Sequence, residues 1–92
     1  MLLFTFERAL SPPPQFAAEW LHGPGAGTSW TAHMLGLRVE HEVRAEGAAS
    51  RLRLDVHTPH RAWIMARPLL RAVIRARSKR LAARMAQDWK SR

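Results

Sequence analysis

The sequence predicts one α+β domain over residues 1–92, with a small antiparallel sheet of about four strands, a short helix near the N-terminus and a long C-terminal helix packed on one sheet face. Three observations predict this fold class. Polar and apolar side chains alternate between residues 37 and 57, the hydrophobic spacing becomes helical after Pro59, and proline or glycine clusters separate the segments. Cysteine is absent, so packing must stabilise the fold without disulfides.

The first strand is predicted at residues 2–9, LLFTFERA, because this stretch is rich in aromatic side chains and alternates in polarity after its first residues. The following SPPP ends the strand. A proline at the first helical position favours a short helix over residues 14–22, PQFAAEWLH. The glycine-rich residues 23–27 then end this helix and predict an irregular loop.

Two half-buried strands are predicted at residues 37–45 and 50–58. Their apolar side chains fall on one face, which we call the inner face, and their charged side chains fall on the outer face. A turn centred on Glu46 and Gly47 would make every outer pair complementary, with Arg38 opposite Asp55, Glu40 opposite Arg53 and Glu42 opposite Arg51. We prefer this register to one shifted by two residues, which sets Glu40 against Asp55 and Arg44 against Arg51.

A second hairpin is predicted around Leu35 and Gly36. It pairs the segment TSWTAHM, residues 28–34, with residues 37–43. This pairing places Trp30, Ala32 and Met34 on the inner face and brings Trp30 next to His41.

The C-terminal segment predicts one helix from about residue 60 to residue 89, disturbed at Pro68 because proline removes a helical hydrogen bond and clashes with the preceding turn. Its apolar side chains recur at helical spacing and form one stripe, in which Ser78 fills one step. The stripe consists of Trp63, Leu70, Ile74, Leu81, Met85 and Trp89. We expect it to pack on the inner sheet face, leaving the arginines in water.

Charge is distributed unevenly along the chain. Residues 1–60 carry five basic and six acidic side chains, whereas residues 61–92 carry ten basic side chains and one acid, Asp88. Such asymmetry suggests an anionic partner. The candidate nucleic-acid contacts are Arg71, Arg75, Lys79, Arg80 and Arg84. A solvated back of a core helix, a membrane-surface helix and a protein-binding helix remain alternatives.

No catalytic site is predicted. The five histidines lack HxH or HExxH spacing and cysteine is absent, so we expect no metal and no other cofactor. Neither a serine nucleophile motif nor a complete phosphate-binding loop occurs. Only His41 interrupts the apolar inner face. It is either a core histidine hydrogen-bonded to backbone or to Trp30, or a polar contact in a ligand pocket.

Two short stretches carry a family resemblance. The segment GAGTSW enters the strands with Gly25, Gly27, Thr28 and Trp30, and ARPLLRAVIRARSKRLAARM closes the chain as a helix near Pro68. In this order of elements the chain resembles the SRPBCC superfamily of START-like, Bet v 1-like or polyketide cyclase-type helix-grip domains. Such domains usually have about 140 residues and six or seven strands, so the chain resembles a shortened version.

The resemblance implies a non-catalytic domain that binds a small hydrophobic ligand between the sheet and the C-terminal helix. The implied lining is Trp30, Met34, Val39, His41, Leu54, Leu70 and Ile74. Because four strands cannot wrap a long helix, two copies could complete each other as a homodimer. We expect a cytoplasmic protein, since no stretch approaches the apolar length of a membrane span and the N-terminus lacks the basic region of a signal peptide.

Overall fold

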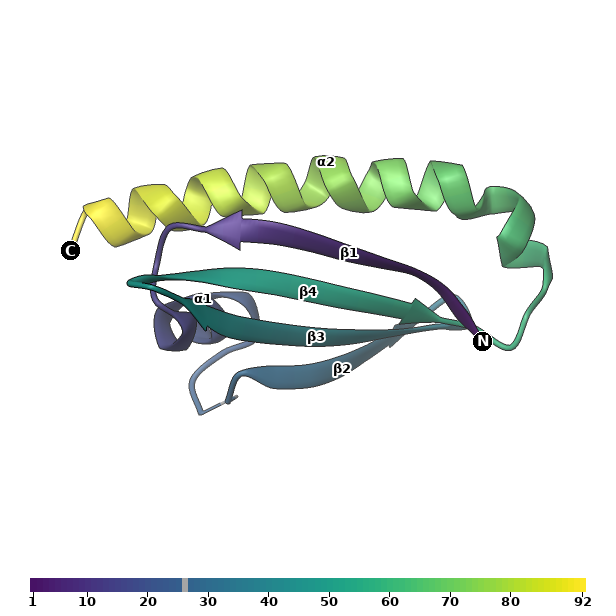
Figure 1. Ribbon diagram of the computed structural model, residues 1–92, viewed down its shortest axis with the longest axis horizontal. Coiled ribbons are helices and arrows are strands. Elements are labelled where there is room, and N and C mark those ends of the chain that lie inside the picture. The colour runs from purple at the N-terminus through teal and green to yellow at the C-terminus, as the bar shows by residue number, and fades with distance from the viewer. Residues whose placement is uncertain (26) are drawn as a thin grey trace.

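The computed structural model describes residues 1–25 and 27–92 and has the predicted α+β architecture. In chain order its elements are β1 (Leu2–Leu10), α1 (Pro14–Leu21), β2 (Ser29–Met34), β3 (Leu37–Glu46), β4 (Ala49–His57) and α2 (Ala62–Lys90). The strands form one antiparallel sheet in the order β1-β4-β3-β2, so the first strand pairs with the last (Figure 1). Within the predicted glycine-rich loop, Ala26 lies outside the described residues.

The turn between β2 and β3 has the predicted register. Trp30 lies opposite His41, and Met34 lies opposite Leu37. The two central residues of the turn, Leu35 and Gly36, both have positive φ, at 49° and 76°. Positive φ at both positions is typical of a type I′ turn, which matches the right-handed twist of the flanking strands.

The predicted register between β3 and β4 is wrong by two residues. The structure pairs Glu46 with Ala49, so the turn is centred on Gly47 and Ala48. Gly47 has a φ of 64°, which suits the first central position of a type II′ turn, whereas the predicted turn placed Glu46 there. Turn geometry therefore outweighs the complementarity of the exposed charges, which contributes little in water.

The observed register places like charges opposite each other on the outer face, namely Glu40 opposite Asp55 and Arg44 opposite Arg51. Neighbouring side chains offset the repulsion between the like charges in both pairs. Arg44 forms an ion pair with Glu42, and Arg51 forms one with Glu46 at 2.9 Å. Asp55 accepts a hydrogen bond from the Thr5 hydroxyl at 2.7 Å. This bond is the main reason that the pKa of Asp55 is lowered, and nearby Arg53 adds to the effect.

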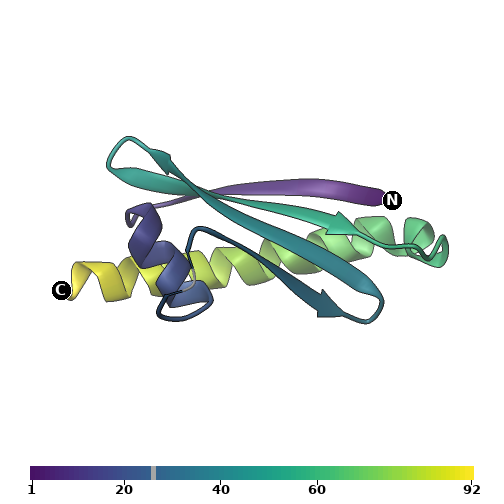
Figure 2. The same ribbon diagram turned by 90° about the horizontal axis from the view of Figure 1, so that it is seen from below.

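The hydrophobic core lies between the inner sheet face and the two helices. Figures 1 and 2 show α2 running along the whole sheet on the side of β1. The helix contributes the fully buried Met85 and the partly buried Trp63, Leu70 and Ile74, as its apolar stripe predicts. Pro68 lies inside α2, and the beginning of the helix turns away from the line of the rest (Figure 1). The sheet contributes Phe4, Phe6, Leu10, Leu37, Val39, Val43, Leu52, Leu54 and Val56.

Ser78 occupies the polar step of the α2 stripe and is only 6 % exposed. Its hydroxyl accepts a hydrogen bond from Nε of Arg8 at 2.9 Å and donates one to the carbonyl of Arg75 at 3.0 Å. Arg8 comes from the inner face of β1, opposite Leu52. The buried hydroxyl of Ser78 therefore has both a donor and an acceptor as partners, and it links the first strand to the last helix.

The helix α1 closes the core at the C-terminal end of α2. Ala17 and Ala18 are fully buried, and Phe16 packs against Trp89 with ring centroids 4.9 Å apart. Indole Nε1 of Trp20 donates to Asp88 at 2.6 Å. Asp88 is the one acid among residues 61–92, so this hydrogen bond uses the single negative side chain of the basic segment.

Candidate functional site

His41 and Trp30 form a stack on the inner side of β2 and β3. Their ring centroids lie 4.9 Å apart with planes 11° from parallel, and His22 stacks at 5.2 Å from Trp30. Nδ1 of His41 lies 3.1 Å from the carbonyl oxygen of Val39. His41 is therefore partly buried, backbone-bonded and stacked, which are the features of the core histidine described above.

His41 is expected to make stability depend on pH. Burial is the main cause that lowers its pKa below the ordinary value of 6.5; the hydrogen bond to Val39 opposes this, and positive Arg77 and His22 nearby add to it. The pKa of His41 is lower in the folded state than in the unfolded state, so protonation favours unfolding. The contribution of His41 to the free energy of unfolding is therefore fully present above pH 6.5 and is lost as the pH falls below 6.5. Urea unfolding at about pH 7.5 and about pH 5 should show a smaller loss for His41→Phe than for the wild type. The exposed Met65→Ala changes no titratable group and should keep the wild-type loss, and equal losses for all three proteins would contradict the assignment.

Among the described residues, the other predicted lining residues do not come together in either of the two cavities described below. Val39 and Leu54 are each 7 % exposed and belong to the core, and Leu70 and Ile74 pack against it from α2. Met34 lies at the end of β2 with 48 % of its surface exposed. Trp30 and His41 line a small polar recess of about 330 Å³, together with outer-face residues such as Glu40 and Asp55.

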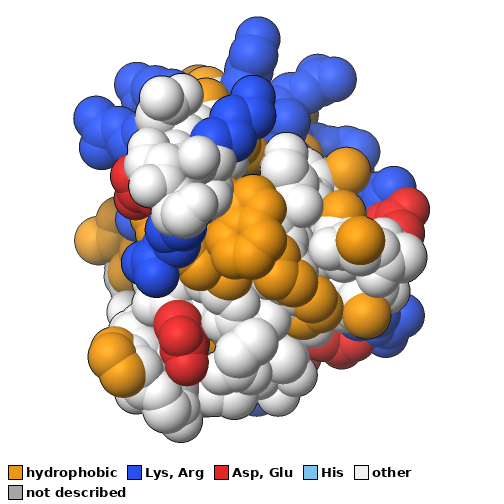
Figure 3. All heavy atoms as spheres, turned by 90° about the vertical axis from the view of Figure 1, so that its left-hand side faces the viewer, with side chains coloured by type: hydrophobic (Ala, Val, Ile, Leu, Met, Phe, Trp, Pro, Cys, Tyr) orange, Lys and Arg blue, Asp and Glu red, His pale blue; other side chains and the backbone are white. Residues whose placement is uncertain are grey.

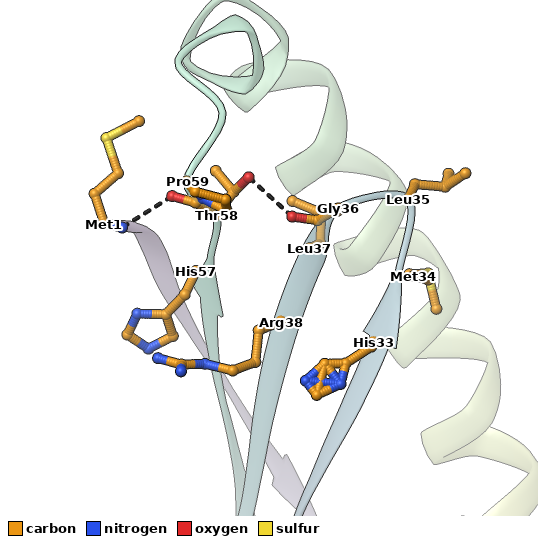
Figure 4. A pocket seen from close by; sticks show the side chains of 10 residues that line it. All are labelled: Met1, His33, Met34, Leu35, Gly36, Leu37, Arg38, His57, Thr58 and Pro59. Carbon is orange, nitrogen blue, oxygen red and sulfur yellow. Dashed lines mark hydrogen bonds between the residues drawn. The ribbon is translucent and has the colours of Figure 1, made fainter.

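A larger open cavity, of about 690 Å³, lies at the end of the sheet where the chain begins. It is formed where the β2–β3 turn, the start of β1 and the segment after β4 meet (Figure 4). Thr58 holds these parts together, because its hydroxyl donates to the carbonyl of Gly36 at 2.9 Å and its backbone bonds with that of Met1. The apolar lining consists of Met1, Met34, Leu35, Leu37 and Pro59.

The polar lining of this cavity is a row of three basic side chains on neighbouring strands. His33 lies opposite Arg38, and Arg38 lies opposite His57. Their side chains project to the same side of the strands (Figure 4). The sheet register alone brings them together, because alternate residues of each strand share the outer face.

Glu40 is the acid nearest to this row, but its carboxylate does not accept a hydrogen bond from Arg38 or His57. Its carboxylate lies 3.6 Å from Nε of Arg38 and 3.4 Å from Nε2 of His57, and neither contact is a hydrogen bond. Among the described residues, buried Nε2 of His57 has no hydrogen-bond partner. Arg38, whose side chain is 52 % exposed, therefore keeps N–H donors for a further anionic group.

The sequence did not reveal this row, for a specific reason. The register predicted for β3 and β4 placed Asp55 opposite Arg38, and a carboxylate there would have neutralised the arginine. In the observed register His57 takes that place, and Asp55 moves opposite Glu40. A turn prediction centred on Gly47 would have found the row.

The candidate nucleic-acid contacts Arg71, Arg75, Lys79, Arg80 and Arg84 are all exposed on α2. Within residues 1–25 and 27–92, no ion pair joins any of them to an acid. Figure 3 views the molecule from its C-terminal end and shows lysine and arginine side chains gathered at the top, over α2. The helix thus presents its positive charge away from the sheet.

The described residues contain no group of three or more histidine or acidic side chains arranged to hold a metal ion. They also contain no helix that is both long enough and apolar enough to cross a bilayer. Comparison with known proteins found no match to a family model, a curated protein or a solved structure. The helix-grip resemblance therefore stays a prediction.

Proposed function

We propose that the protein binds a small amphiphilic anion, an apolar chain ending in a carboxylate, in the cavity at the end of the sheet. The observation that carries this proposal is the side-by-side arrangement of Arg38, His33 and His57 beside an apolar lining. Arginine binds a carboxylate through paired N–H donors, and the apolar wall favours the chain that follows it.

The proposed ligand is apolar in large part, like the one that the resemblance implies, but its site lies at the end of the sheet and not between the sheet and α2. Between the sheet and α2, the predicted lining residues Val39 and Leu54 are already covered by protein atoms. A ligand there would have to displace close-packed side chains. At the end of the sheet, a ligand would instead fill an existing recess of about 690 Å³, which lies within the usual range for small-molecule sites.

The test compares three probes by thermal denaturation and calorimetry. Decanoate should raise the melting temperature by mass action, because it binds the folded state alone. Decanol lacks the charge and acetate lacks the chain, so each should have a much smaller effect. Equal shifts for decanoate and decanol, or none for either, would refute the proposal.

A variant pair then locates the site. Arg38→Gln should weaken decanoate binding by about tenfold or more, since a hydrogen bond to a charged group contributes about 1.5–3 kcal/mol. Arg44→Gln is the matched control, because Arg44 lies on the same strand and the same face but outside the cavity. Unchanged affinity in Arg38→Gln would place the ligand elsewhere.

A second candidate function is nucleic-acid binding through α2, favoured by exposed basic side chains that form no ion pair with any described residue, namely Arg71, Arg75, Lys79, Arg80 and Arg84. Contacts of this kind are made to phosphates and release counterions. Binding of a generic polynucleotide at about 50 mM salt that is lost steeply by about 200 mM would be its signature.

A further inference from the structure

Large exposed apolar side chains lie on three segments, namely the N-terminus, the β2–β3 turn and the first half of α2, and we call this set the apolar tip. It includes Leu2, Met34, Leu35, Met65, Leu69 and Val73, which are between 48 % and 87 % exposed. Figure 1 places the N-terminus, the β2–β3 turn and the start of α2 at one end of the molecule. The turn touches the segment before α2, because a β-carbon built on Gly36 would lie 2.8 Å from the ring of His60.

On α2, the residues of the apolar tip form a second stripe. Met65, Leu69 and Val73 are spaced four apart and so lie on one side of the helix. They lie opposite Ile74 and Ser78, which face the sheet, so packing within the chain does not explain them. An apolar patch of this kind on a soluble face usually marks an interaction site.

Leu35 is unfavourable in the monomer in two ways. It is 80 % exposed, and it has a φ of 49°, a left-handed conformation that bulky side chains rarely adopt. Asparagine, aspartate or glycine is preferred at the first central position of a type I′ turn. Strain at an exposed position often accompanies function, and here it presents a leucine at the very tip of a hairpin.

The segments that build this end carry a net positive charge, although Glu40 of β3 lies 3.6 Å from Nε of Arg38. These segments, residues 1–4, 33–38 and 57–76, contain no aspartate or glutamate, but they contain Arg38, Arg61, Arg67, Arg71 and Arg75. Exposed apolar side chains rimmed by arginines match an anionic lipid surface, in which acyl chains take the apolar groups and phosphates take the cations. Two other partners fit this end less well. A second copy of the chain would bring two positively charged ends together. A polynucleotide has no apolar interior in which Leu35 or Met65 could be buried.

We infer that the apolar tip docks onto the surface of an anionic phospholipid bilayer. The leucine of the hairpin and the outer stripe of α2 enter the interface, while the arginines bind lipid phosphates. This inference does not rest on the proposed ligand. The apolar tip and its rim share Met34, Leu35 and Arg38 with the cavity, but Met65, Leu69 and Val73 do not line it.

The experiment measures sedimentation of the full chain with vesicles of phosphatidylglycerol and phosphatidylcholine, and with vesicles of phosphatidylcholine alone. The protein should bind the anionic vesicles and only weakly the neutral ones. Leu35→Asn should weaken binding about tenfold while raising the melting temperature, because asparagine accepts the left-handed turn. Met65→Ser combined with Leu69→Ser should also weaken binding, whereas Ala83→Ser, on the exposed C-terminal half of α2, should not.

Three results would overturn the inference: no binding to anionic vesicles, binding that Leu35→Asn leaves unchanged, or tighter binding to a polynucleotide than to vesicles. The two proposals are separable. Arg38→Gln should lose decanoate but keep most vesicle binding, and Met65→Ser with Leu69→Ser should lose vesicles but keep decanoate.

Discussion

Replacing Met85 with alanine is expected to lower the free energy of unfolding by about 3 kcal/mol, because truncating a buried methionine removes apolar contacts and leaves a cavity. Met85 is the fully buried side chain through which α2 enters the core. A small domain has a total stability of about 5–15 kcal/mol, so this one change should remove a large part of it. Urea unfolding followed by circular dichroism measures the effect.

Met65→Ala provides the matched control. Met65 lies on the same helix and is 87 % exposed, so its truncation should change the free energy of unfolding by less than about 0.5 kcal/mol. Alanine has a higher helix propensity than methionine, and this difference slightly stabilises the helix in both variants. Equal losses in the two variants would show that α2 does not pack on the sheet through Met85.

Replacing Gly36 with alanine is expected to lower the free energy of unfolding by about 1–2 kcal/mol, which is the backbone strain of a residue with a side chain in a left-handed conformation. The φ of Gly36 is 76°, and an added β-carbon would lie 2.8 Å from Cδ2 and 3.1 Å from Nε2 of His60. These atoms are the end of an exposed side chain that can turn aside, so the contact should add little to the strain. Thermal denaturation reports the loss of stability.

Gly47→Ala separates the two contributions. Gly47 has a φ of 64°, but a β-carbon there would meet nothing within 4 Å. This variant should therefore show only the backbone strain, about 1–2 kcal/mol. Gly36→Ala should lose about as much stability as Gly47→Ala, and a loss larger by more than about 1 kcal/mol would show that the ring of His60 is held rigidly against the turn.

Much of the fold could be predicted because different local signals agreed. The alternation around Val39 and Leu54 fixed the inner face, and the helical spacing of Leu70, Ile74 and Met85 fixed the side of α2 that packs on it. Leu35 and Gly36 marked one turn correctly. The alternation and the helical spacing reflect burial, which dominates the free energy of folding and leaves a periodic trace in the sequence, whereas the turn reflects backbone conformation.

The register of β3 and β4 could not be predicted from charge, because exposed ion pairs contribute too little to select it. The preference of Gly47 for a left-handed conformation was the stronger signal. The candidate site was missed for the same reason, because Arg38 and His57 become neighbours only in the correct register. The apolar tip was missed because Met65, Leu69 and Val73 lie beside the core stripe in sequence and become distinct only when the buried side of α2 is known.

The pairing of β1 with β4 has a consequence for the order of folding. Leu10 pairs with Ser50 and Phe4 pairs with Val56, and Arg8 bonds to Ser78 across 70 residues. During synthesis the first strand therefore emerges long before its partners, and it must wait with its aromatic side chains unprotected. The two hairpins from β2 to β4 close early from local contacts, whereas incorporation of β1 has to close the longest loop of the sheet. Contacts of such large sequence separation slow folding, so this strand is the one whose capture should limit the rate.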